Sequence, residues 1–288
     1  MTIKVILVPV TATETAAGTL KTAFALGRRF EAHVAALHVR ADPRNAMPYM
    51  GEGMSGLVLQ EIMAAADRDA AERAKTARAL FDQVAAESGV PIVDVPRIPA
   101  QFSAAWREEI GREDEVVARR ARLADVVVVG AQPARQSAAV GMMMEAALLE
   151  SGRAVLVSPP QPAASFGGSI AVAWNGSAEA SRAVAAAMPF LNAAERIAIL
   201  AVGEGGEADA SAGSLKQYLA WHGLEAEAAA VRPGPEGIGP AILAEAKRRG
   251  CDLLVMGAYT HNRFRQMIFG GVTRHILSEA DLPVLVAH

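Results

Sequence analysis

The chain has 288 residues, of which 52% are hydrophobic and 20% are charged, and this composition excludes an intrinsically disordered protein. Its length predicts about two domains. The formal net charge of −3 argues against a nucleic-acid partner, and the single cysteine, Cys251, excludes a disulfide framework. The sequence contains no run of about 18 apolar residues, so no membrane span is predicted.

The first residues, MTIKVILVPV, predict a β-strand rather than a signal peptide, because the apolar run is short and no cleavage site follows. We therefore expect a cytoplasmic protein. Further along, DPRNAMPYMGEGMSGL precedes an alanine-rich helix that is predicted to end near Gly89. Met142, Met143 and Met144 are interpreted as packing at the start of a later helix, since methionine fills irregular gaps.

The second half alternates strands and helices after a linker at 159–168, where proline and glycine cluster. We predict strands at 169–174, 196–203, 224–231, 251–257 and 283–287, and helices near 177–191, 210–222, 237–249 and 270–280. Strands that are apolar throughout indicate burial on both faces, which is typical of a parallel sheet covered by helices. This alternation predicts an α/β, doubly wound fold.

Two segments, 124–158 and 251–287, resemble each other. In each, an Asp precedes an apolar strand ending in Gly, and Asp125 and Gly130 recur as Asp252 and Gly257, 127 residues later. A repeat of this length indicates a duplicated domain. We expect two tandem, five-stranded, Rossmann-like parallel-sheet domains, at 1–160 and 161–288. Each ends in an apolar strand, so we expect the copies to pair through these strands as an intramolecular pseudo-dimer.

Ligands of doubly wound sheets bind beyond the carboxyl ends of the strands, between the first and fourth strands in the order 3-2-1-4-5. In the second copy, the loops concerned begin at Trp174 and Gly257. The residues 270–273, Gly-Gly-Val-Thr, open the last helix, whose free N–H groups and dipole favour an anion. Arg263 would add positive charge to a phosphate site. Alternatively, the glycines form only a tight turn.

This loop resembles the nucleotide-binding signature of the universal stress protein family, which is Gly, two residues, Gly, nine residues, Gly, then Ser or Thr. Gly257 and Gly270 fall on the first and third glycines, and Thr273 falls on a hydroxyl position two residues further along. Thr260 replaces the second glycine and Gly271 replaces the Ser or Thr.

The resemblance covers essentially the whole chain, twice. It implies a five-stranded sheet, pairing through the last strand, ATP binding in some members and roles in the stress response. Asn175 stands where nucleotide-binding members usually have Asp, and an Asn amide can still hydrogen-bond a base.

The first copy departs further from the signature. With the same offset of 127, Met143 and Met144 stand opposite Gly270 and Gly271, and Pro133 stands opposite Thr260. Bulky side chains at these positions would fill the space of a phosphate. We therefore interpret the first copy as structural.

The sequence predicts a tandem universal stress protein, a stress-response regulator that binds ATP, AMP or another adenine nucleotide in its second domain. The candidate site residues are Asn175, Gly257, Thr260, Arg263, Gly270, Gly271, Val272 and Thr273. No catalytic constellation and no metal-ligand spacing are recognisable. Two alternatives remain, a ligand-free protein-interaction module with vestigial pockets and a slow ATPase, and a homodimer is possible.

Overall fold

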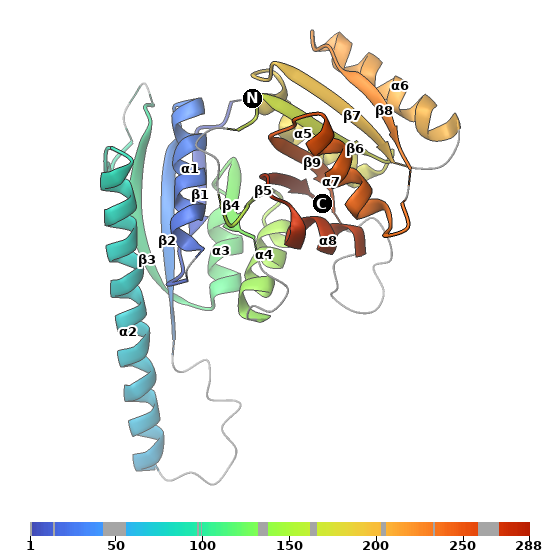
Figure 1. Cartoon of the computed structure of the whole chain (residues 1–288). Helices are drawn as coiled ribbons and strands as arrows, with labels where there is room; N and C mark the ends of the chain where they lie inside the picture. Colours follow the sequence, from blue (N-terminus) through green and yellow to red (C-terminus); the bar gives the residue numbers. More distant parts are fainter. Residues whose placement is uncertain are drawn as a thin grey trace.

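Strands and helices alternate along the whole chain in the computed structural model (Figure 1), which describes residues 2–13, 15–42, 56–96, 98, 100–131, 138–161, 166–202, 206–232, 234–258 and 271–288. The first copy comprises β1 (Val5–Pro9), α1 (Ala16–Phe30), β2 (His33–Ala41), α2 (Gly56–Glu87), β3 (Ser103–Gly111), α3 (Glu113–Ala121), β4 (Val126–Gly130), α4 (Ala138–Glu150) and β5 (Ala154–Ser158). The second comprises β6 (Ser169–Trp174), α5 (Ala178–Leu191), β7 (Arg196–Val202), α6 (Gly206–Trp221), β8 (Glu227–Val231), α7 (Ile238–Arg248), β9 (Leu253–Gly257), α8 (Gly271–Glu279) and β10 (Val284–Ala287).

All of these strands belong to one sheet, in the order β3-β2-β1-β4-β5-β10-β9-β6-β7-β8. Each copy therefore has the predicted order 3-2-1-4-5, and within each copy every pairing is parallel. The α/β doubly wound fold predicted from the sequence is confirmed.

The two copies are joined by antiparallel pairing of their last strands, β5 and β10. Leu156 lies opposite Leu285, and both side chains are completely buried. This confirms the predicted intramolecular pairing. Because each of these strands now has a neighbour on both sides, a homodimer cannot form through them.

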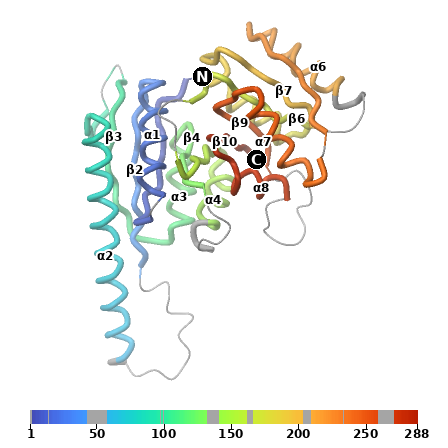
Figure 2. The backbone as a smooth tube through the Cα atoms, viewed as in Figure 1, coloured from blue at the N-terminus to red at the C-terminus, as the bar shows by residue number. Residues whose placement is uncertain are grey.

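Helices cover the sheet in two layers that run through both copies (Figure 2). On one face, α1, α2, α5 and α6 pack over one set of strand residues, and on the other face α3, α4, α7 and α8 pack over the alternate set. In β1, for example, Ile6 and Val8 face the first layer whereas Leu7 faces the second. This alternation follows from the two-residue period of a strand, and burial on both faces explains why the strands are apolar throughout.

Arg29, in the last turn of α1, also connects the two copies. Its guanidinium donates to the carbonyl oxygens of Phe166 and Gly167, each at 3.0 Å, and of Ala193 at 2.6 Å. The neighbouring Phe30 ring meets Phe190 of α5 edge to face, with ring centroids 5.3 Å apart. One turn of helix thus binds the chain that enters β6 and the chain that follows α5.

The helix α2 reaches well beyond the sheet at one end (Figure 1). It has 32 residues, whereas the neighbouring strand β3 has nine. Its buried side chains begin at Ala70 and continue with Ala74, Ala77 and Phe81, at the helical spacing that places them on one face. The described side chains that precede Ala70 are exposed or half-buried.

Structural alignment of the two copies changes the offset that the sequence suggested. Gly130 and Gly257 differ by 127, but their partners on the last strands, Ser158 and Ala287, differ by 129. The last residues of α4 and α8, Glu150 and Glu279, also differ by 129. The shift corresponds to two fewer residues in the first copy between the fourth strand and the end of the following helix.

With this offset, Gly141 and Met142, rather than Met143 and Met144, correspond to Gly270 and Gly271. The methionines also lie in the middle of α4 and not at its start, because this helix begins at Ala138. Met143 and Met144 are buried at 4% and 5% exposure, whereas Met142 is 52% exposed. The expected packing role is therefore confirmed for Met143 and Met144 and wrong for Met142, and the expected place at the start of the helix was wrong.

We expect the two copies to unfold in a single cooperative transition, since they share one sheet and two common helix layers. Leu285→Ala should lower the free energy of unfolding by about 2–5 kcal/mol, the usual cost of truncating a fully buried leucine. The measurement is urea denaturation followed by circular dichroism. The control is Leu123→Ala, whose side chain is 76% exposed and should cost little. Two separate transitions in the native protein would contradict this expectation.

Candidate functional site

The carboxyl ends of β6 and β9 lie side by side in the second copy. Ala173 of β6 is paired with Met256 of β9, so the loops that begin at Trp174 and Gly257 leave the same edge of the sheet. The helices that follow diverge, because α5 packs on one face of the sheet and α8 packs on the other. This is the switch point at which doubly wound sheets bind ligands.

The first loop, residues 174–177, is fixed by its own side chains. The Asn175 side-chain oxygen accepts from the Ser177 N–H at 3.1 Å, and the Ser177 hydroxyl caps α5 by accepting from the Ala180 N–H at 3.1 Å. Gly176 between them has φ of +74°, a conformation that favours glycine. Asn175 is exposed, and its NH₂ group has no hydrogen-bond partner among the described residues. It therefore offers two donors at the edge of the sheet.

Ser211 of α6 supports this loop from the side. Its hydroxyl accepts a hydrogen bond from the Trp174 indole N–H at 2.9 Å. A Cβ at Gly176 would lie 3.1 Å from the same hydroxyl oxygen, so the loop and α6 pack closely. Sequence reasoning missed Ser211, because it is 37 residues away from Trp174 and lies in a helix without a recognisable motif.

Gly257 ends β9 directly beneath the first turn of α5. A Cβ at this position would lie 2.5 Å from the Ala180 backbone nitrogen and 2.6 Å from the Glu179 carbonyl carbon. Glycine is thus required here for helix α5 to approach the sheet. This packing role differs from the contact with a ligand that the sequence suggested, and it holds whether or not a ligand binds.

The helix α8 begins at Gly271, across the edge from α5. Gly271 is exposed, and a Cβ there would meet no atom of the described residues within 4 Å. Val272 is half-buried against the helix layer, and Thr273 is buried at 6% exposure on the inner face of α8. The remaining candidates, Thr260, Arg263 and Gly270, lie outside the described residues.

A carboxylate that sequence reasoning did not consider, Glu179, lies in the first turn of α5. A hydrogen bond from its own backbone N–H lowers the pKa of this carboxyl, and Arg182 and His288 lower it further. Arg182 forms an ion pair with Glu179 at 3.4 Å. Glu179 is therefore ionised at neutral pH and places a negative charge at the first turn of α5.

The equivalent edge of the first copy is filled by threonines. A Cβ at Gly130 would lie 2.7 Å from the Thr19 hydroxyl oxygen, and Thr19 is buried and donates to the Thr15 carbonyl at 3.0 Å. Thr11 and Thr13 share a hydrogen bond of 3.1 Å in the preceding loop. The hydroxyl groups here satisfy one another or the backbone.

Across the described ranges, no group of three or more His, Cys, Asp or Glu side chains is arranged to hold a metal ion. Within the same part of the chain, no helix is both long and apolar enough to cross a membrane.

Gly257→Ala should destabilise the protein by about 1–3 kcal/mol, the usual cost of overpacking, because the added methyl group collides with the backbone of α5 rather than with a movable side chain. Gly271→Ala is the matched control, since its added Cβ enters open space, and it should change stability little. Thermal denaturation of both variants is the measurement. Equal stability of the two variants would show that α5 can move away from β9 at little cost.

The comparisons with known proteins agree with this fold. The family model described as "Universal stress protein family" matches residues 126–288, which is more than half of the chain. No curated protein matches the chain.

Several solved structures have the same fold. A universal stress protein from Archaeoglobus fulgidus superposes with a TM-score of 0.69 at 15% identity, covering 98% of this chain and 97% of that chain. A putative universal stress protein from Pseudomonas aeruginosa superposes with a TM-score of 0.56 at 13% identity, covering 99% of this chain and 93% of that chain. The cytoplasmic domain of a prokaryotic cation chloride cotransporter superposes with a TM-score of 0.54 at 12% identity, covering 100% of this chain and 96% of that chain.

At these identities the superpositions show a common fold only, whereas the match to the family model rests on the sequence itself. The match extends from β4 of the first copy through the whole second copy, which includes the switch point. The chain therefore belongs to the universal stress protein family.

Proposed function

We propose that this universal stress protein is a ligand-responsive regulator of the stress response, which binds ATP or another adenine nucleotide in its second domain. In this proposal, residues 1–160 and 161–288 are the two domains, and the first is structural. The observation that supports it is the switch point at the carboxyl edge of β6 and β9, where α5 and α8 pack on opposite faces of the sheet.

Asn175 is the proposed contact to the adenine base. Its side-chain oxygen is occupied by the Ser177 N–H, so the amide is oriented with its NH₂ group available. Two N–H donors suit the ring nitrogens of adenine, which are acceptors. The loop is held by Trp174, Ser211 and the cap at Ser177, so the amide requires little reorganisation on binding.

The start of α8 is the proposed phosphate contact. Gly271 leaves the N-terminal turn open, and the free N–H groups of a helix N-terminus attract anions. Gly270, Thr260 and Arg263 belong to this proposal from the signature and the charge alone. The Glu179 carboxylate opposes a highly charged ligand, so Arg263 has a second role in offsetting this repulsion.

Gly271→Ser should strengthen ATP binding by about fivefold, the effect of one added hydrogen bond, because it restores the hydroxyl of the family signature in a place that has room for it. Gly271→Ala is the matched control, since it adds the Cβ without the hydroxyl. Isothermal titration calorimetry with ATP measures the affinities. A gain in both variants would assign the effect to backbone rigidity instead of the hydroxyl.

Gly270→Met should abolish nucleotide binding, because its side chain would crowd the helix N-terminus, while Arg263→Ala should weaken ATP more than adenosine. An arginine acts on phosphate charge and leaves contacts to the base unchanged. Calorimetry with both ligands, together with circular dichroism to confirm folding, is the test. If the native protein gives no heat with high-micromolar ATP and copurifies with no nucleotide, the proposal is wrong and the ligand-free interaction module stands.

A further inference from the structure

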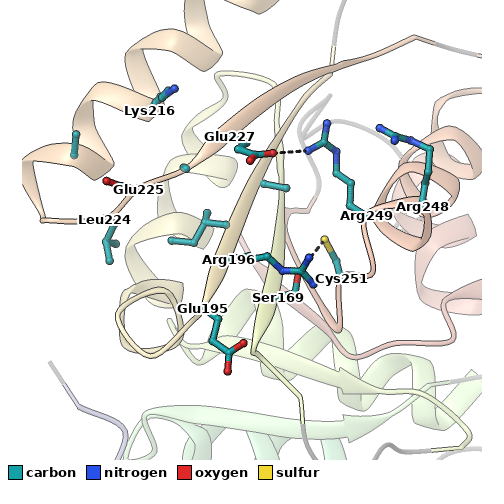
Figure 3. Close-up of a pocket in the computed structure, with 14 residues that line it drawn as sticks. Ser169, Glu195, Arg196, Lys216, Leu224, Glu225, Glu227, Arg248, Arg249 and Cys251 are labelled. Atoms are coloured by element: carbon teal, nitrogen blue, oxygen red, sulfur yellow. Dashed lines mark hydrogen bonds and ion pairs between the residues drawn. The ribbon is translucent and has the colours of Figure 1, made fainter.

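A cavity among the described residues lies at the amino edge of the second copy, opposite the edge proposed for the nucleotide. Its volume is about 990 Å³, at the upper end of the range of roughly 300–1,000 Å³ that is usual for small-molecule sites. The amino ends of β6, β7 and β9 contribute Ser169, Arg196 and Cys251, and α6 contributes Lys216. Figure 3 shows these side chains around the cavity.

The first copy has only a small counterpart of this cavity. At the amino edge of the first copy, a cavity of about 200 Å³ is lined by His33 and Arg120 among other residues. His33 begins β2 as Arg196 begins β7, and its ring Nδ1 is hydrogen-bonded to the Ser103 hydroxyl at 3.0 Å. This cavity of the first copy is therefore much smaller than the cavity at Arg196.

Two of the four cations on the wall, Arg248 and Arg249, are already paired. Glu245 is hydrogen-bonded to Arg248 at 2.6 Å and to Arg249 at 2.7 Å, and hydrogen bonds from Arg248, with further ones from Arg249, lower the pKa of Glu245 to about 2. Arg249 also pairs with Glu227 at 3.3 Å. These two arginines are therefore held by protein carboxylates.

Arg196 differs from them. Within the part of the chain that the structure describes, its guanidinium makes no hydrogen bond and no ion pair. Figure 3 shows it gathered with Ser169 and Cys251 at one end of the cavity. The Ser169 hydroxyl makes only a weak hydrogen bond of 3.8 Å to the Cys251 sulfur, so it can turn to another acceptor. This end of the cavity therefore offers the unpaired N–H donors of a guanidinium and a hydroxyl group.

We propose that this cavity binds a small organic molecule through a carboxylate group, held by the Arg196 guanidinium and the Ser169 hydroxyl. A guanidinium pairs with a carboxylate through two parallel hydrogen bonds. Glu195, Glu225 and Glu227 also line the cavity, and these charges disfavour a polyphosphate. The site is therefore distinct in ligand class, as well as in place, from the proposed nucleotide site, and it does not depend on the function proposed above.

Cys251 provides a reporter at this site, because it is the single cysteine of the chain. Cys251 is 9% exposed. Burial raises the pKa of its thiol, and the charges of Arg196 and Arg249 lower this pKa in part. Reaction with a thiol reagent should therefore be slow in the native protein. A carboxylate bound at Arg196 would slow it further by covering the sulfur.

The test is calorimetric titration of the full chain with acetate, succinate, citrate, pyrophosphate and ATP. We expect at least one carboxylate to bind more tightly than pyrophosphate and to slow the modification of Cys251. Arg196→Gln should weaken this binding by about tenfold or more, the loss expected for a charged hydrogen-bond pair. Arg153→Gln is the matched control, since Arg153 is likewise an exposed arginine at the amino end of a strand, but in the first copy and outside the cavity. This variant should bind the carboxylate as the native protein does.

Several results would overturn the proposal. These are no binding of any carboxylate at millimolar concentration, equal affinity in Arg196→Gln and the native protein, or tighter binding of pyrophosphate that is lost in Arg196→Gln. Ser169→Ala provides a second variant with a smaller expected loss, should Arg196→Gln fail to fold. Saturating carboxylate should leave ATP affinity unchanged, so that failure of one site is distinguishable from failure of the other.

Discussion

The antiparallel pairing of β5 with β10 is the constraint on which the architecture depends. Within each copy the strands are parallel and require helices on both faces, and a free last strand would expose its backbone donors and acceptors. Pairing the two last strands satisfies these groups within the chain. It also aligns the helix layers of the two copies, so that Phe30 of one can pack against Phe190 of the other. The duplicated fold thus behaves as one body.

The same pairing determines where ligands can approach. Because the strands reverse direction at the junction, the carboxyl edges of the two copies face opposite ways. The proposed nucleotide site of the second copy and the threonine-filled edge of the first therefore lie on opposite edges of the sheet. The cavity at Arg196 lies at the amino edge of the second copy, and hence on the same edge as the threonines of the first.

Most of the fold could be predicted from the sequence, because a parallel sheet buried on both faces leaves a simple pattern of apolar runs. The second-copy strands and helices were predicted to within a few residues, and the strand order and the junction were correct. The least accurate boundary is that of α6, predicted from residue 210 and observed from Gly206. Its first turn, Gly-Glu-Ala-Asp, includes Gly and Asp, which have low helix propensity.

The site was less predictable, because its residues are brought together by the fold. A glycine pattern indicated Gly257, but its close contact with Ala180 depends on how α5 crosses the sheet. The constant offset of 127 failed beyond the fourth strand, since a two-residue difference between the copies leaves no signal in the motif itself. The cavity at Arg196 could not be foreseen at all, as Ser169, Lys216 and Cys251 come from different elements.

The length of α2 has a consequence for the dynamics of the first copy. At about 1.5 Å per residue, its 32 residues extend about 48 Å, and side-chain burial supports it only from Ala70 onward. Among the described residues, the preceding turns depend on helix propensity, on local pairs such as Asp69 with Arg73, which contribute only a few tenths of a kcal/mol each, and on the ion pair of Asp67 with Arg40 of β2 at 3.4 Å. A single helix thus joins a firmly packed half to a half that can open by itself. We expect amide hydrogen exchange along α2 to be graded accordingly, fast toward Gly56 and slow toward Glu87, without any boundary in the secondary structure.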